Sequence, residues 1–200
     1  MKEFFVSTPE VRFVELFKSW LVSLPHDLKI AFEAMDDENL PRSSREIAVG
    51  AIMYVVSPND FVFDRNEAVA SFADDALLLR LALRQVVKGS GEDGEAFADR
   101  FPELFEGLDD DIDVCKEVMG ELMAWLEGKV DGLRNQTYKG KKIKIWIDDD
   151  VARAELYEDG LGFRTDYPVD DKIIDDKLKY ATTVTDVMRR RRAEETRAAV

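Results

Sequence analysis

The sequence contains 200 residues, of which 46% are hydrophobic, and it carries a formal net charge of −14 at pH 7. This size suits one globular domain or two small ones, and the negative charge disfavours nucleic acids and anionic membranes as partners. With one cysteine and one histidine, the chain has no pair of cysteines for an internal disulfide and no histidine cluster for zinc.

The longest apolar run, residues 47–56, is too short to span a bilayer. The first residues also lack the apolar core of a secretory signal. We therefore expect a cytoplasmic protein without a transmembrane segment, although apolar residues near Phe4 and Phe61, together with the arginine run 189–192, permit peripheral contact with a membrane.

The first two thirds of the chain have the apolar spacing of a helical bundle. Thr8, Pro9 and Glu10 form a helix start, and Pro25 is expected to end or bend the helix that follows. After a short second helix, residues 41–56 form a third helix that is apolar nearly all round, which is typical of a central position.

Helical spacing returns after the proline and aspartate-rich turn that follows this third helix. It continues from residue 66 to residue 88, where a glycine-rich stretch, 89–94, is expected to be a loop. Further on, apolar residues predict one strong helix over 109–133, behind an acidic first turn that complements the helix dipole.

The composition changes after residue 132. Ile143, Ile145 and Ile147 alternate with other residues, which favours a strand, and the Asp159-Gly160 pair is a strong hairpin signal. The expected strands are 141–147, 151–158 and 161–167. A helix over 169–192 would cover this small sheet.

The sequence therefore predicts an α+β fold that is predominantly α. An N-terminal helical bundle, residues 1–135, is followed by a three-stranded antiparallel meander with a C-terminal helix, residues 137–200.

Four carboxylates surround the central apolar helix: Asp60, Asp64, Asp74 and Asp75. The first interpretation is structural, because aspartates at helix ends cap free backbone N–H groups and, when buried, need cations such as Arg45, Arg80 or Arg84. The second is a Mg²⁺ or Mn²⁺ site, because hard cations prefer carboxylate oxygens. The third is a pair of carboxylates for acid-base catalysis.

The same region resembles the YkvA-like family, bacterial domains of unknown function, over about residues 42–88. The resemblance rests on an arginine before an apolar helix, a tyrosine, a Ser-Pro-x-Asp turn and a later Asp-Asp pair. The matching residues are Arg45, Tyr54, Pro58, Asp60, Asp64, Asp74 and Asp75. It implies a compact helical domain, often expected to associate with membranes, and no established activity.

Two functions remain open from the sequence. The first is a non-enzymatic scaffold or interaction module without a cofactor, which self-associates or binds a protein partner through residues 137–200. The second is a hydrolase or transferase that uses Mg²⁺ or Mn²⁺ at the four aspartates. We favour the non-enzymatic module, because the sequence has no recognisable catalytic motif and because the edges of the strands expected over 141–167 are natural pairing sites.

Overall fold

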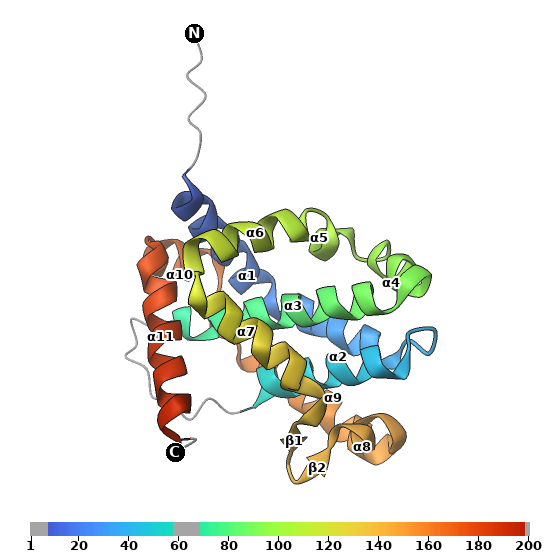
Figure 1. The fold of residues 1–200 in the computed structure, drawn as a ribbon. Coiled ribbons are helices and arrows are strands. Elements are labelled where there is room, and N and C mark those ends of the chain that lie inside the picture. Colours follow the sequence, from blue (N-terminus) through green and yellow to red (C-terminus); the bar gives the residue numbers. More distant parts are fainter. Residues whose placement is uncertain (1–7, 58–68, 199–200) are drawn as a thin grey trace.

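The structure, a computed structural model, describes residues 8–57 and 69–198, and these residues are almost entirely helical (Figure 1). The helices are α1 (Pro9–Asp36), α2 (Arg42–Val56), α3 (Ala73–Gly89), α4 (Gly91–Ala98), α5 (Pro102–Phe105), α6 (Leu108–Met119), α7 (Glu121–Gly132), α8 (Ile143–Asp148), α9 (Asp150–Asp166), α10 (Asp171–Lys177) and α11 (Ala181–Ala198), with 3₁₀ turns η1 (Ala70–Phe72) and η2 (Leu133–Asn135). Two short strands, β1 (Thr137–Tyr138) and β2 (Lys141–Lys142), pair in an antiparallel hairpin. No helix in these ranges is long and apolar enough to cross a membrane.

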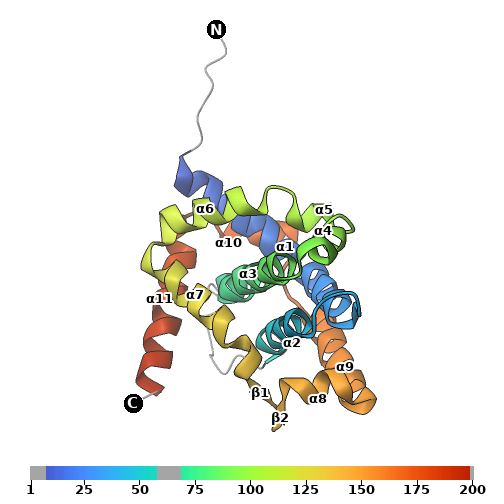
Figure 2. The same ribbon diagram turned by 45° about the vertical axis from the view of Figure 1, so that its right-hand side comes forward.

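Helices α2 and α3 lie at the centre of the bundle. Figure 2 views both nearly end-on, with α1, α6, α7 and α9 around them. The expectation of an apolar, central third helix is confirmed, because α2 buries residues on almost every side. Gly50 of α2 lets η2 approach closely, since a Cβ atom at this position would lie 2.7 Å from the Leu133 carbonyl oxygen.

Helix α1 begins as expected but does not end at Pro25. Thr8 caps it by accepting a hydrogen bond from the Val11 backbone N–H at 3.4 Å. A proline inside a helix normally leaves the carbonyl four residues earlier without a partner. Here the Tyr167 hydroxyl donates to that carbonyl, Leu21 O, at 2.6 Å. A residue from the C-terminal segment thus supplies the hydrogen bond that Pro25 cannot make.

The prediction of a three-stranded meander, and with it an α+β fold, is wrong: the described part of the chain has only the two-stranded hairpin, and residues 143–166 form α8 and α9. The alternation of isoleucines was misleading, because Ile143, Trp146 and Ile147 also have helical spacing and are the residues that α8 buries. Ile145, between them, is 36% exposed.

The Asp159-Gly160 pair does not form a turn but lies inside α9. The residues that α9 buries, Ala152, Leu156 and Gly160, are spaced four apart, which places them on one helical face. Gly160 contacts the ring of Phe32 in α1, so its missing side chain serves helix packing. The actual tight turn is Lys139-Gly140, where both residues have a positive φ, as a two-residue hairpin loop requires.

The Gly160 contact predicts a measurable asymmetry between two glycines of α9. An alanine Cβ at Gly160 would lie 2.5 Å from the Phe32 ring, whereas at Gly162 nothing lies within 4 Å. We expect Gly160→Ala to lower the free energy of unfolding by about 1–3 kcal/mol through overpacking. Gly162→Ala, the matched control, should raise it by about 0.5–1 kcal/mol because alanine is the better helix former. Urea unfolding measures both, and equal effects of the two substitutions would contradict this packing.

Other boundaries also differ from expectation. Residues 91–94, expected in a loop, open α4. The long helix expected over 109–133 is divided into α6 and α7 at Gly120, whose φ of 54° is costly for any other residue. The helix expected over 169–192 is likewise divided into α10 and α11, and α11 extends to Ala198.

Segments on both sides of residue 136 contribute to one hydrophobic cluster. Phe17 of α1, Leu79 of α3, Leu156 of α9 and Val184 of α11 are all buried in it. The division into units 1–135 and 137–200 stays a prediction.

Candidate functional site

The structure places some of the predicted site residues and not others. Pro58, Asp60 and Asp64 lie outside the described residues. Asp74 and Asp75 lie in the first turn of α3, with 0% and 1% of their surface exposed. Negative charge at this end of a helix is favourable because it complements the helix dipole.

Asp74 is held between a tyrosine and an arginine. The Tyr54 hydroxyl of α2 donates to Asp74 Oδ2 at 2.6 Å, and Nη1 of Arg191 in α11 forms an ion pair with Oδ1. The same guanidinium donates to the Ser71 carbonyl oxygen at 3.4 Å. Since Arg191 is only 7% exposed, this is a buried ion pair with polar partners on both sides.

A second ion pair lies beside the first. Lys129 of α7 contacts Glu195 of α11 at 2.5 Å and the Tyr54 hydroxyl at 3.3 Å. Its ammonium also lies 4.9 Å from the centre of the Tyr54 ring and 4.8 Å from that of Trp125. We call Tyr54, Asp74, Lys129, Arg191 and Glu195 the α11 cluster, and it ties α11 to α2, α3 and α7.

The α11 cluster changes the acidity of Tyr54. Burial raises the pKa of the Tyr54 phenol well above 10.0, and the negative charges of Asp74 and Asp75 raise it further. Tyr54 therefore stays protonated in the folded protein at pH values where an unfolded tyrosine ionises. A phenol with so high a pKa is a hydrogen-bond donor and is not suited to act as a general base near neutral pH.

This shift predicts a loss of stability at alkaline pH. Above pH 10 the unfolded chain releases the Tyr54 proton and the folded chain keeps it, so the free energy of unfolding falls as pH rises. Between pH 8 and pH 11 this residue alone should account for about 1.4 kcal/mol. Tyr54→Phe removes that contribution, so its stability should fall less steeply over this range in urea unfolding. Parallel pH profiles for the two proteins would contradict the assignment.

Arg45 contacts a backbone carbonyl within the described residues. Its Nε donates to the Met35 carbonyl oxygen at 2.8 Å. This contact satisfies a carbonyl in the last turn of α1, where cations are favourable. Arg45 thus orients α2 against the end of α1.

Arg80 and Arg84, which were expected to pair with the four aspartates, form ion pairs with other carboxylates. Arg80 pairs with Asp27 of α1 at 2.7 Å, with side-chain exposures of 6% and 2%, and its guanidinium donates to Ser23 Oγ at 3.0 Å. Burial raises the pKa of Asp27, although the charge of Arg80 opposes this. Arg84, one turn further along α3, pairs instead with Asp109 of α6.

Residues 8–57 and 69–198 do not offer a set of ligands for a metal ion. Within these ranges, no group of three or more His, Cys, Asp or Glu side chains is placed to hold one. Asp74 accepts from Tyr54 and Arg191, which occupy the oxygens that a metal would need. Two of the four proposed ligands, Asp60 and Asp64, lie outside those ranges, so a Mg²⁺ or Mn²⁺ site stays a prediction.

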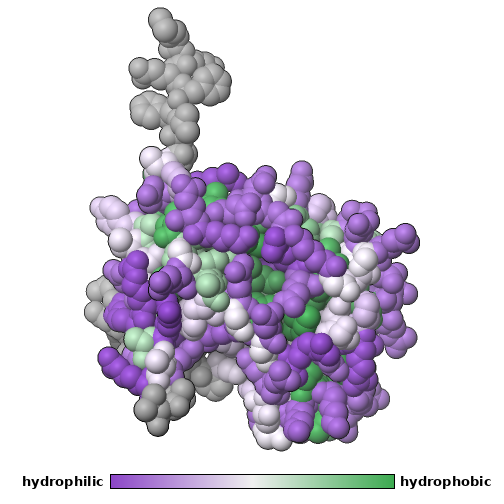
Figure 3. Space-filling view, in the orientation of Figure 1, coloured by the Kyte–Doolittle hydropathy of each residue, from purple (hydrophilic) through white to green (hydrophobic). Residues whose placement is uncertain are grey.

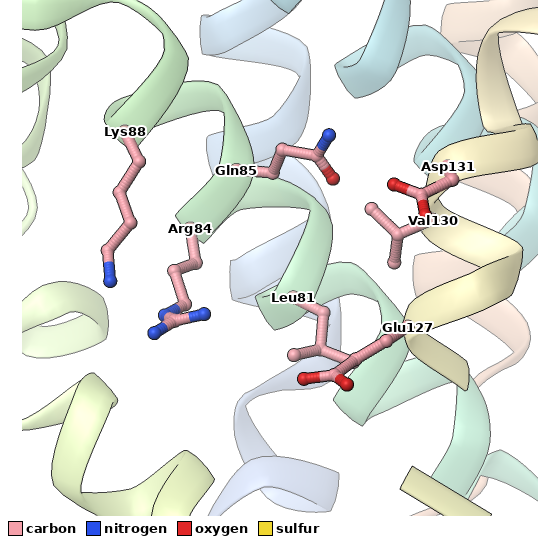
Figure 4. A pocket seen from close by; sticks show the side chains of 7 residues that line it. All are labelled: Leu81, Arg84, Gln85, Lys88, Glu127, Val130 and Asp131. Atoms are coloured by element: carbon pink, nitrogen blue, oxygen red, sulfur yellow. The ribbon is translucent and has the colours of Figure 1, made fainter. Parts of the chain in front are cut away.

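A pocket of about 230 Å³ lies between α3 and α7 (Figure 4). Its floor is apolar and its rim is charged. The lining residues are Leu81, Arg84, Gln85, Lys88, Glu127, Val130 and Asp131. Both cations of the rim are also held by Asp109. Figure 3 shows the same face of the molecule as mainly hydrophilic, with hydrophobic residues gathered near its centre.

A second concave surface of about 300 Å³ lies between α1 and α9. We call it the α1/α9 groove. Its lining is Lys29, Phe32, Tyr157, Glu158, Gly160, Leu161 and Arg164. The rings of Phe32 and Tyr157 are stacked with centres 4.5 Å apart, and the Tyr157 hydroxyl donates to Asp36. The groove is therefore apolar, with a fixed aromatic wall.

No family model, curated protein or solved structure matches this chain. The resemblance of residues 42–88 to the YkvA-like family stays a prediction.

Sequence reasoning missed the residues that complete the α11 cluster. Arg191 belongs to the arginine run 189–192, which lies at the end of the helix expected over 169–192, but α11 continues beyond this run. The available signal was spacing, because Val184, Val187, Met188 and Arg191 follow each other at intervals of three, one and three residues on one helical face, and all four are buried.

Proposed function

We propose that this chain is a non-enzymatic interaction module that binds a protein partner through α9, in the segment 137–200. The observation that carries the proposal is the exposure of large apolar side chains on this single helix. Val151 is 79% exposed, Leu161 is 63% exposed and Tyr157 is 40% exposed. Contact with a partner would remove this apolar surface from water, which contributes about 25 cal/mol for each Å² buried.

The α1/α9 groove adds a shape to this exposed surface. Phe32 and Gly160 form its base, and Tyr157 and Leu161 form its side. Interfaces are commonly centred on an apolar or aromatic anchor that enters such a depression, with polar groups at the rim. The charges at this rim are Lys29, Arg164 and Glu158.

The buried ion pairs elsewhere in the molecule have contacts that support a structural role for these charged residues. The two buried ion pairs, Asp74 with Arg191 and Asp27 with Arg80, each join α3 to another helix. Their oxygens and nitrogens are engaged with each other and with Tyr54 or Ser23. They stabilise a scaffold on which α9 is presented to solvent.

Photocrosslinking tests the proposal. A benzoylphenylalanine at position 161 should form a protein adduct of one defined mass in an extract of the cells from which the chain comes. The same amino acid at the exposed Lys116 of α6 serves as a matched control. Excess unlabelled protein should suppress the adduct, and excess Leu161→Lys protein should not, because a lysine at this position cannot fill an apolar contact.

The proposal fails if position 161 forms no adduct, either with another protein or with a second copy of the chain. It also fails if adducts at positions 161 and 116 are suppressed equally by both competitors, because that result would show contact without a specific surface.

A further inference from the structure

Helix α9 presents a regular stripe of exposed residues to solvent. Val151, Ala154, Glu158, Leu161 and Thr165 follow each other at intervals of three and four, and all five are exposed. This is the spacing by which two helices pack along a common seam. The opposite face of α9 is buried against the bundle through Ala152, Leu156 and Gly160. Figure 2 shows α9 at the edge of the molecule.

The stripe is complementary to itself when two copies run antiparallel. Val151 and Leu161 lie ten positions apart, with Leu156 at the midpoint. If a twofold axis passes at the level of Leu156, Val151 of each copy lies level with Leu161 of the other, so the two most exposed aliphatic side chains of α9 cover one another. Ala154 then lies level with Glu158, and its small side chain leaves room for the glutamate methylenes.

The charges beside the stripe fit the same register. Asp150 and Arg164 lie on the same side of α9, because the 14 positions between them correspond to about four helical turns. In the antiparallel pair, Asp150 of one copy is displaced from the level of Arg164 of the other by two residues, or about 3 Å, which an arginine side chain spans easily. The Asp150 side chain is 95% exposed and forms a 3.5 Å pair with Arg153 in the same helix.

We propose that a second copy of this chain binds α9, and that the two α9 helices pack antiparallel around a twofold axis at Leu156. The inference rests on the proposed function, which assigns α9 as the binding surface, and it names the partner. Each dimer contains two Val151–Leu161 contacts and two Asp150–Arg164 ion pairs, because every contact of a twofold interface occurs twice. The reciprocal charges also offset the repulsion between two chains of net charge −14.

Charge reversal of the full chain tests both the dimer and its register. Asp150→Arg places two like-charged Arg–Arg pairs in the dimer, and Arg164→Asp places two Asp–Asp pairs. Sedimentation velocity over a range of concentrations should show that each variant self-associates at least about tenfold more weakly than the wild type. Asp176→Arg, an exposed change on α10, is the matched control and should leave association unchanged.

The two reversed variants provide a sharper test when they are mixed. A heterodimer of Asp150→Arg with Arg164→Asp contains one native ion pair and one pair with reversed charges, so the mixture should associate as strongly as the wild type although each component alone does not. The double variant Asp150→Arg/Arg164→Asp should also recover association.

Two outcomes overturn the inference. A wild type that stays monomeric at all concentrations removes the second copy as partner, and an adduct at position 161 with another protein would then still support the proposed function. A dimer that is unaffected by either reversal excludes this register of α9.

Discussion

Replacing Arg191 with methionine is expected to lower the free energy of unfolding by about 3–5 kcal/mol. The substitution keeps an unbranched side chain of similar helix propensity but removes the cation that faces Asp74. Asp74 has no exposed surface and would be left as a buried carboxylate that accepts a hydrogen bond from the Tyr54 hydroxyl and faces no cation in Arg191's place. Urea or thermal unfolding of the full chain measures the loss.

Arg189→Met is the matched control, two residues earlier in the same arginine run. Arg189 pairs with Asp186 across one turn of α11, and both side chains are 58% exposed. Exposed pairs of this kind contribute about 0–1 kcal/mol. A double variant, Arg191→Met with Asp74→Leu, should recover much of the stability lost in Arg191→Met, because it removes the unpaired charge. If Arg191→Met costs no more than Arg189→Met, the buried pair is not a structural element.

Replacing Arg80 with methionine is expected to cost about 3–5 kcal/mol as well. Arg80 neutralises Asp27, donates to Ser23 and lies with its guanidinium 4.9 Å from the centre of the Trp20 ring. Its loss would leave Asp27, which is 2% exposed, without a cation. Arg84→Met, one turn along α3, should cost no more than about 1 kcal/mol, because Asp109 in the Arg84 pair is 58% exposed.

The cost of Arg80→Met should also depend on pH. Burial already raises the pKa of Asp27 above 3.8 with Arg80 present, and removing the cation raises it further. A carboxyl with a raised pKa in the folded state is most favourable when protonated, so its penalty is smallest in acid and grows as pH rises through the folded pKa. The difference in unfolding free energy between wild type and variant should therefore be smaller at pH 4.5 than at pH 7. A difference that is independent of pH would contradict this role for Asp27.

The sequence supports the helical half of the prediction better than the rest. Runs such as residues 41–56 are apolar nearly all round and long enough to favour a buried helix. Residues 141–167 are ambiguous, because isoleucines at alternate positions suit a strand while Ile143, Trp146 and Ile147 suit a helix. What decides between them is tertiary: Trp146 and Ile147 pack against the bundle, and Gly160 fits beneath Phe32. No local pattern contains that information.

The sequence could predict that the candidate site needs a cation, but not which residue supplies it. That Asp74 would need a cation follows from its place before an apolar helix. Which arginine supplies the cation does not, because Arg80, Arg84 and Arg191 are chemically identical and differ only in the helix faces that tertiary packing brings together. The sequence argument did not offer Arg191 as a partner for the aspartates, and it is the one that pairs with Asp74.

The ion pair between Asp74 and Arg191 also bears on the order of events during synthesis and folding. The two residues are separated by 117 positions, so at synthesis rates of about 5–20 residues per second Arg191 leaves the ribosome roughly 6–25 seconds after Asp74. During this interval α1, α2 and α3 have all emerged, and Asp74 lacks its cation. We therefore expect the start of α3 to stay accessible to water until α11 arrives, so that the final burial of Asp74 is a late step of folding.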